Sequence, residues 1–148
     1  MNHRLRILLA DDNREVAESI RLLISDDFEL AGVVQDGMAL VEAVLAMKPD
    51  VIVADISMPR MDGLAAMMEF RKRNLHPKVI FLTNYSDLSL AHAVLEAGAY
   101  GYVLKYTAST DLNPAIRQAL LGQTFISPRL LRTQLSLSRP GEGGPKAG

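Results

Sequence analysis

The sequence predicts an α/β fold in which helices cover both faces of one parallel sheet. Four short apolar runs are continuous rather than alternating, as is typical of strands buried on both faces: residues 7–10, 51–54, 79–82 and 102–104. Segments with apolar residues three and four positions apart separate these runs and indicate amphipathic helices. Regular alternation of strand and helix predicts right-handed crossovers, and therefore a doubly wound sheet.

Five strand and helix pairs follow one another along the chain. The run at residues 7–10 is the first strand, and residues 28–34, interrupted by Glu29 and Gly32, suit an edge strand. The helical periodicity is carried, in chain order, by Val16, Ile20, Leu23 and Ile24; by Leu40, Ala43, Val44 and Met47; by Leu64, Met67 and Met68; by Leu88, Ala91 and Leu95; and by Ile116, Ala119 and Leu120.

The start of the last helix has two interpretations because a proline lies near it. Either Asn113 caps the helix and Pro114 is its first helical residue, or an earlier cap at Ser109 or Thr110 leaves one backbone hydrogen bond unmade.

Composition excludes several classes of protein. A length of 148 residues with 49% hydrophobic residues is enough for one buried core and too short for two ordinary domains. The 16 basic and 17 acidic residues exclude a strongly basic nucleic-acid binder, and the absence of cysteine excludes disulfides and thiolate metal sites. No apolar run approaches the ~20 residues of a membrane span, and the first ten residues lack the pattern of a signal peptide. A cytoplasmic protein without membrane contact is expected.

A composition change near residue 131 predicts the domain boundary. Residues 1–131 are expected to form the globular domain, and residues 132–148, rich in glycine and proline, a flexible tail or truncated linker. Only the 17 residues of that segment follow Leu131, too few for a helix-turn-helix domain of about 60 residues. The sequence therefore predicts no DNA-binding domain, and no DNA binding, in this chain.

Polar residues follow four of the strands at the point where each strand ends. Asp11 and Asp12 follow the first strand, Asp55 the third, Thr83 the fourth and Lys105 the fifth. Taken singly, each has an ordinary explanation as a helix cap or a solvated charge. Because parallel strands end at one edge of a doubly wound sheet, where such folds bind ligands, the five side chains are expected to converge.

That combination of groups is suited to phosphoryl transfer. Clustered carboxylates repel one another unless a cation is present, and oxygen ligands favour Mg²⁺. Zinc is a poor candidate, because His3, His76 and His92 are dispersed. A lysine and a threonine can hold phosphoryl oxygens, and Asp55 on the middle strand can act as the nucleophile.

These residues sit in motifs that resemble the receiver domain of bacterial two-component response regulators. The motifs are the pair Asp11-Asp12, the runs at residues 55–63 and 81–83, and the run at residues 98–105 that ends in Lys105. Residues 122–128 further resemble the NarL/FixJ subfamily, whose members usually carry a helix-turn-helix effector. The resemblance covers about residues 5–131 and implies a flavodoxin-like, three-layer fold of five helices around a five-stranded parallel sheet of order 2-1-3-4-5.

The resemblance implies a metal role for the acidic residues. Asp55 is then the phosphoacceptor, and Asp12, Asp55 and the backbone carbonyl of Ser57 are direct Mg²⁺ ligands. Asp11 completes the acidic pocket and acts on the metal through water. The turn at residues 61–63 then shapes the loop, with Asp62 capping the following helix.

It also implies a switch. Lys105 pairs with Asp55 or its phosphoryl group, Thr83 donates its hydroxyl to a phosphoryl oxygen, and Tyr102 changes rotamer, turning inward as Thr83 moves. The phosphoryl charge thereby biases a two-state element.

Two residues depart from the family pattern, and the methionines of the same region have an ordinary structural explanation. Tyr106 replaces the proline that usually follows the lysine, which makes a cis bond improbable and suggests a different arrangement of the next loop. Asn84 replaces a small residue after Thr83 and narrows access to Asp55. The methionines of this region are expected simply to pack in the core or loops: Met58, Met61, Met67 and Met68.

The function expected from these features is a signalling switch rather than an enzyme acting on other molecules. A sensor histidine kinase or phosphotransfer protein is the expected phosphodonor, transcription the expected output through an effector absent from this chain, and a homodimer formed on phosphorylation is compatible with this function. A haloacid-dehalogenase-like phosphohydrolase needs a second aspartate where Ser57 stands. The remaining alternative is a receiver-like interaction module that works without phosphorylation.

Overall fold

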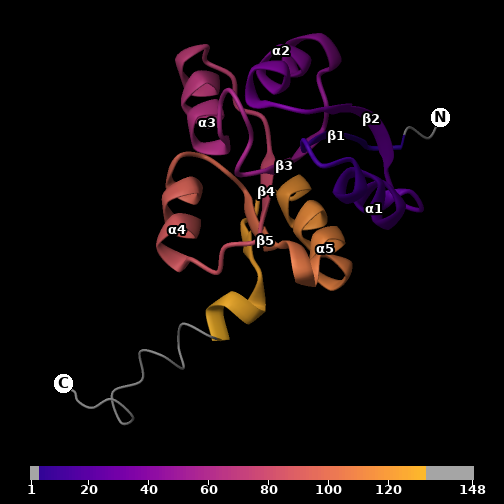
Figure 1. Ribbon diagram of the computed structural model, residues 1–148, viewed down its shortest axis with the longest axis vertical. Helices are drawn as coiled ribbons and strands as arrows, with labels where there is room; N and C mark the ends of the chain where they lie inside the picture. The colour runs from indigo at the N-terminus through magenta and orange to yellow at the C-terminus, as the bar shows by residue number, and fades with distance from the viewer. Residues whose placement is uncertain (1–3, 133–148) are drawn as a thin grey trace.

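A computed structural model describes residues 4–132 of the chain. Strands and helices alternate from the first element to the fifth helix (Figure 1). The elements, in chain order, are β1 (Arg6–Ala10), α1 (Arg14–Ile24), β2 (Glu29–Val34), α2 (Gly37–Met47), β3 (Val51–Asp55), α3 (Gly63–Lys72), β4 (Val79–Thr83), α4 (Leu88–Glu96), β5 (Gly101–Leu104), the 3₁₀ turn η1 (Lys105–Thr107), α5 (Ala108–Leu120) and β6 (Phe125–Ile126).

The sheet has the predicted order, with one strand added. Its order is β2-β1-β3-β4-β5-β6, so the predicted 2-1-3-4-5 arrangement is confirmed. All pairs are parallel, and the crossover from β2 back past β1 to β3 places the switch in strand order at β1 and β3. The sixth strand, which the sequence did not predict, pairs with β5 through Phe125 and Ile126.

The sheet separates two hydrophobic cores, because successive side chains of a strand point to opposite faces. On β1, Leu8 and Ala10 join α2, α3 and α4 in one core, whereas Ile7 and Leu9 join α1 and α5 in the other. β3 and β4 divide in the same way. Figure 1 shows this sandwich, with α1 and α5 on one side of the sheet and α2, α3 and α4 on the other.

Side-chain caps start four of the helices just after the strand-end loops. Asn13, Asp36, Asp62 and Asp87 each accept a hydrogen bond from a backbone N–H of the first turn of α1, α2, α3 and α4 respectively. The predicted capping role of Asp62 is thus confirmed, with its carboxylate 2.8 Å from the amide nitrogen of Ala65.

Of the two interpretations of the start of α5, the earlier cap is the correct kind, because Pro114 lies inside the helix, but the helix begins before the proposed caps at Ser109 and Thr110. The helix begins at Ala108, directly after the 3₁₀ turn, with Thr107 in the N-cap position and Pro114 inside the helix. Proline has no N–H, so one hydrogen bond of the helix is missing at this point. The apolar face of α5 outweighs that loss, because Leu112, Ala115 and Ile116 are fully buried against the sheet.

After β6 the chain turns helical again over residues 128–132. The tail or linker predicted for residues 132–148 otherwise lies outside the described residues. Among residues 4–132, none of the helices has both the length and the apolar character needed to cross a membrane.

Candidate functional site

Three carboxylates meet at the carboxyl ends of β1 and β3. The two strands are neighbours, with Ala10 opposite Ala54, so the residues that follow them lie side by side. Oxygens of Asp11, Asp12 and Asp55 all lie within 4.8 Å of one another. The structure therefore brings the predicted acidic residues together at the switch in strand order.

Each of the two inner carboxylates also shapes its own loop. Asp11 Oδ1 accepts the N–H of Asn13 at 2.8 Å, and Asp55 Oδ1 accepts the N–H of Ser57 at 3.0 Å. Such turns leave the second oxygen of each carboxylate directed away from the loop backbone. The side chain of Asp11 is fully buried and that of Asp55 is 11% exposed, whereas Asp12 is exposed.

Lys105 provides the positive charge of the site from the end of β5. Its ammonium lies 3.0 Å from Asp55 Oδ2 and 3.4 Å from Asp11 Oδ2. Burial lowers the pKa of Lys105, but the hydrogen bond to Asp55 and the charges of both carboxylates outweigh that effect, so the pKa is raised. Lys105 is therefore protonated, and its ammonium donates a charge-assisted hydrogen bond to Asp55 Oδ2.

Asp11 is left with an unsatisfied oxygen. Its Oδ2 is buried and accepts no hydrogen bond from the described residues, although the Lys105 ammonium stands 3.4 Å away. Burial raises the pKa of Asp11, and the N–H of Asn13 and the charge of Lys105 counter this only in part. One ammonium faces three carboxylates, so the site carries an excess of negative charge that a further cation can neutralise.

Thr83 and Tyr102 lie behind the acidic site on β4 and β5. The Thr83 hydroxyl, fully buried, accepts the N–H of Tyr85 at 3.0 Å. The Tyr102 ring is also fully buried, and its hydroxyl donates to the backbone carbonyl of Tyr85 at 2.7 Å. Burial raises the pKa of this hydroxyl. The residue predicted to turn inward is thus already inward in this structure, and the Tyr85 backbone joins it to Thr83.

The sequence did not single out Tyr85, because its part is played by backbone atoms. Its side chain is 56% exposed, while its N–H and carbonyl contact Thr83 and Tyr102. Nothing in the residue type signals this. Only the position two residues after Thr83 could have suggested it.

The departures from the family pattern lie at the rim of the site. Asn84 is exposed after Thr83, and Tyr106 is 58% exposed after Lys105. All peptide bonds of residues 4–132 are trans, and the loop after Lys105 is a 3₁₀ turn. A groove between α1 and α5 opens beside Lys105 and Tyr106, lined further by Glu15, Val16 and Ser19.

Neither of the two histidines in the described part of the chain belongs to the site. His92 is exposed on α4, and His76 lies beside Asn74 after α3. His3 lies outside the described residues.

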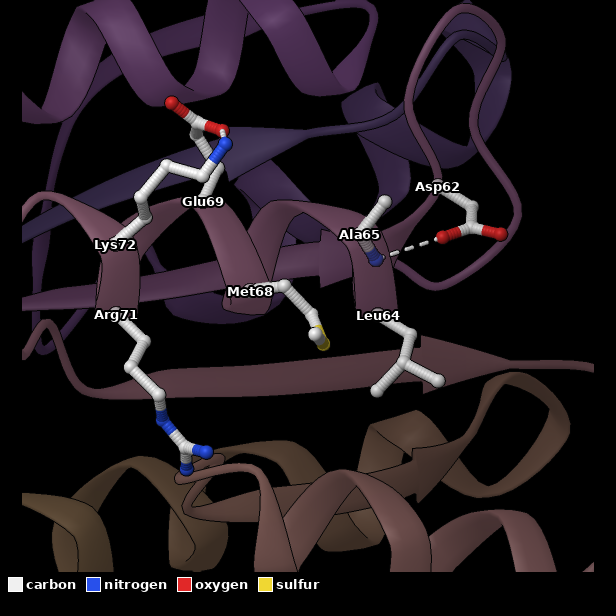
Figure 2. Close-up of a pocket in the computed structure, with 7 residues that line it drawn as sticks. All are labelled: Asp62, Leu64, Ala65, Met68, Glu69, Arg71 and Lys72. Carbon is white, nitrogen blue, oxygen red and sulfur yellow. Dashed lines mark hydrogen bonds and ion pairs between the residues drawn. The ribbon is translucent and has the colours of Figure 1, made fainter.

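One methionine expected to pack is instead exposed. Met58 and Met67 are buried and Met61 packs partly against the core, but Met68 is 63% exposed, because α3 turns it to solvent. Met68 lines a surface recess of about 700 Å³ along α3, together with Leu64, Asp62, Glu69, Arg71 and Lys72. Figure 2 shows the side chains of Met68 and Leu64 next to each other on this helix. None of the carboxylates that cluster at the β1 and β3 ends lines it, so the recess is separate from the candidate site.

Comparison with known proteins agrees with the geometry. Residues 7–117 match the family model of the response regulator receiver domain. The chain is 33% identical over 129 residues to the transcriptional regulatory protein YdfI of Bacillus subtilis, covering 86% of this chain and 60% of that protein. It is 32% identical over 137 residues to the transcriptional regulatory protein LiaR of the same organism, covering 91% and 65% respectively. The chain thus spans less than two thirds of the length of these relatives.

Solved structures share the fold. The receiver domain of the response regulator NarL from Mycobacterium tuberculosis is similar with a TM-score of 0.77 and 26% identity, covering 82% of this chain and all of that one. The isolated receiver domain of RcsB from Salmonella enterica, solved with the phosphomimetic BeF₃⁻, is similar with a TM-score of 0.78 and 26% identity, covering 88% and 98%.

Proposed function

The chain belongs to the family of response regulator receiver domains, and on that premise we propose that Asp55 accepts a phosphoryl group from a phosphohistidine in an Mg²⁺-dependent reaction. The observation that carries the assignment to Asp55 is the Lys105 ammonium, 3.0 Å from Asp55 Oδ2 at the centre of the acidic cluster. Family membership also favours this receiver function over an interaction module that works without phosphorylation.

Asp55 is the best placed nucleophile of the three carboxylates. Asp11 is fully buried, so its carboxylate cannot approach the phosphorus atom of a bulky phosphodonor. Asp12 is exposed and makes no ion pair with Lys105. Asp55 combines partial exposure with the shortest contact to the ammonium. Its Oδ2 can therefore reach an incoming phosphorus atom while the developing charge is stabilised by Lys105.

The proposed transfer exchanges one bond for another. An Asp55 oxygen forms a bond to phosphorus as the bond from phosphorus to the donor's imidazole nitrogen breaks, and the electron pair of that bond leaves with the imidazole. The acyl phosphate places about −1.5 to −2 charge where the carboxylate held one. Lys105 then contacts a phosphoryl oxygen, and the Thr83 hydroxyl donates to another.

The acidic cluster fits a hard divalent cation. The unsatisfied Oδ2 of Asp11 and the excess of carboxylate over ammonium charge both disfavour the cation-free site. Asp12, Asp55 and the carbonyl of Ser57 would hold Mg²⁺, with Asp11 acting through water. When bound, the ion supplies charge neutralisation for the phosphoryl oxygens.

The partners follow from the chemistry and from the relatives. The phosphodonor is a sensor histidine kinase or a phosphotransfer protein, and phosphorylation favours a homodimer. Relatives longer than this chain are transcriptional regulators. We therefore place the output at transcription, through an effector domain outside these 148 residues.

Incubation with acetyl phosphate tests the proposal directly. Intact-mass measurement is expected to show the addition of one phosphoryl group in the presence of Mg²⁺ and none with EDTA. Beryllium fluoride with Mg²⁺ is expected to perturb the NMR signals of the residues around Asp55. Protein that acquires no phosphoryl group and binds no beryllium fluoride contradicts the proposed function.

Mg²⁺ binding is expected to depend on Asp12 and not on histidine. Asp12→Ala removes an oxygen from the cluster and should weaken Mg²⁺ binding by about tenfold or more, since each carboxylate is a major part of such a site. His92→Ala, an exposed change on α4, should leave it unaltered. Titration followed by NMR measures both, and the reverse order of effects points to a different metal site.

Switching is expected to require Thr83 and Lys105. Thr83→Ala and Lys105→Ala should permit some phosphorylation but reduce the accompanying change at residues 84–106, because these two contacts distinguish the two states. NMR shifts of that segment with and without beryllium fluoride measure the coupling. Full shifts in Thr83→Ala, or none in the wild type, contradict the proposed connection from Thr83 to Tyr102.

A further inference from the structure

The last described segment, residues 125–132, lies along the free edge of β5. Backbone hydrogen bonds run from the Phe125 N–H to the Tyr100 carbonyl at 2.9 Å and from the Ser127 N–H to the Tyr102 carbonyl at 3.0 Å. In Figure 1 this segment, in yellow, extends from the β5 edge away from the sheet. It is therefore attached to the strand that carries both Tyr102 and Lys105.

Ser127 extends this attachment with its side chain. Its hydroxyl accepts the N–H of Leu104 at 3.0 Å and donates to Asp111 Oδ2 at 2.7 Å, and the residue is fully buried. Asp111, in the first turn of α5 and 9% exposed, also accepts the Thr107 hydroxyl at 2.6 Å. A buried carboxylate thus orients the hydroxyl that holds the backbone immediately before Lys105.

A second contact holds the residue immediately after Lys105. The guanidinium of Arg129 lies over the Tyr106 ring, 5.4 Å from its centroid. This contact uses the tyrosine that replaces the usual proline. Leu104 and Tyr106 are therefore both held by the same segment, while the Lys105 ammonium between them reaches Asp55.

We propose that residues 125–132 form a clamp that positions Lys105, with Ser127 and Arg129 as its two positioning residues and Asp111 orienting Ser127. The inference rests on the proposed function, since it assigns Lys105 a phosphoryl ligand. The clamp holds the residues on both sides of Lys105 and so keeps its ammonium beside Asp55, in the position that favours a phosphoryl group there. Binding free energies are reciprocal, so the clamp and the phosphoryl site affect each other by the same factor.

The test measures beryllium fluoride affinity at the phosphoryl site and hydrogen exchange of the Leu104 amide at the clamp, at a temperature where the variants are folded. Ser127→Ala removes the hydroxyl and is expected to weaken beryllium fluoride binding, with Mg²⁺ present, by about fivefold, within the usual range of such couplings. It should also raise hydrogen exchange of the Leu104 amide by about tenfold, because that N–H loses its partner. Ser127→Thr keeps the hydroxyl and should restore both.

Further variants separate positioning from simple stability. Arg129→Ala should weaken beryllium fluoride binding in the same direction as Ser127→Ala, and Arg132→Ala, a nearby exposed arginine, should not. Ser89→Ala removes an exposed hydroxyl from α4 and should leave both measurements at wild-type values. If Ser127→Ala does not fold, two other measurements test the clamp. They are the beryllium fluoride affinity of Arg129→Ala, and the hydrogen exchange of the wild-type Leu104 amide with and without beryllium fluoride.

The outcomes distinguish the two proposals. Wild-type protein that binds no beryllium fluoride overturns the proposed function and the clamp with it. If the wild-type protein binds beryllium fluoride and the variants Ser127→Ala and Arg129→Ala bind it with the same affinity, the clamp alone is overturned. This holds even if the thermal stability of the variants falls. Weakened binding that Ser127→Thr restores supports the clamp.

Discussion

Asp55→Asn abolishes labelling by acetyl phosphate and Mg²⁺ while the protein stays folded; this is the largest functional effect we expect of any single substitution. The amide of asparagine is nearly the same size as the carboxylate but has no anionic oxygen to attack phosphorus. Lys105 keeps an ionic partner in Asp11, 3.4 Å away, so its charge is not left alone in the variant. Intact mass measures the label, and thermal unfolding verifies the fold.

A matched control removes a carboxylate elsewhere. Asp26→Asn changes an exposed residue after α1 and should leave labelling at the wild-type level. Peptide mapping of the labelled wild type should place the phosphoryl group on the peptide that contains Asp55. Label that persists in Asp55→Asn, or that appears on Asp11 in equal yield, refutes the assignment of the phosphoacceptor.

Gly37→Ala is expected to cause the largest loss of stability among the glycine substitutions near the site. A Cβ at Gly37 would lie 2.0 Å from the backbone carbonyl oxygen of Met61, in the loop between Asp55 and α3. A side chain could avoid such a clash by rotating, but a backbone oxygen cannot. We expect a loss of about 3 kcal/mol, at the upper end of ordinary overpacking, and a melting temperature lower by about 10 °C.

Gly32→Ala is the matched control for that prediction. Its Cβ would meet the flexible end of Met47 at 2.9 Å, and that side chain can move aside. Its cost should be below about 1 kcal/mol. Circular dichroism melting curves of the three proteins test the comparison. Equal losses in the two variants contradict the idea that the loop after Asp55 is fixed by close backbone contact with α2.

Much of the fold could be predicted because its signals are local. Continuous apolar runs such as residues 51–54 predict buried strands wherever they end in the fold, and the spacing of three and four marks the helices between them. Asp11, Asp55, Thr83 and Lys105 each follow such a run directly. Strand direction in a parallel sheet then places them at one edge, and the structure brings the carboxylates and the ammonium together there.

The start of α5 could not be predicted, because it depends on a balance of free energies across the fold. A proline inside a helix costs a hydrogen bond, so local reasoning left two starts open, one at Pro114 and one after an earlier cap at Ser109 or Thr110. The burial of Leu112 and Ile116 against the sheet is worth about 1.5 to 3 kcal/mol for each side chain, and with buried Ala115 it offsets the cost of about 3 kcal/mol of a proline inside a helix. The helix therefore continues through Pro114.

The contacts around Lys105 and Tyr102 were equally beyond sequence reasoning. β6 has two residues, too few to show a period, and it exists because β5 offers a free edge. Ser127 meets Leu104 and Asp111 across 23 and 16 positions of the chain, and Tyr102 meets the Tyr85 carbonyl across 17. Residue types and their local order suffice for the strands, the helices and the acidic edge of the sheet. The hydrogen bonds that position Lys105 and Tyr102 depend on tertiary structure alone, because each joins groups far apart in the sequence that only packing brings within hydrogen-bond distance.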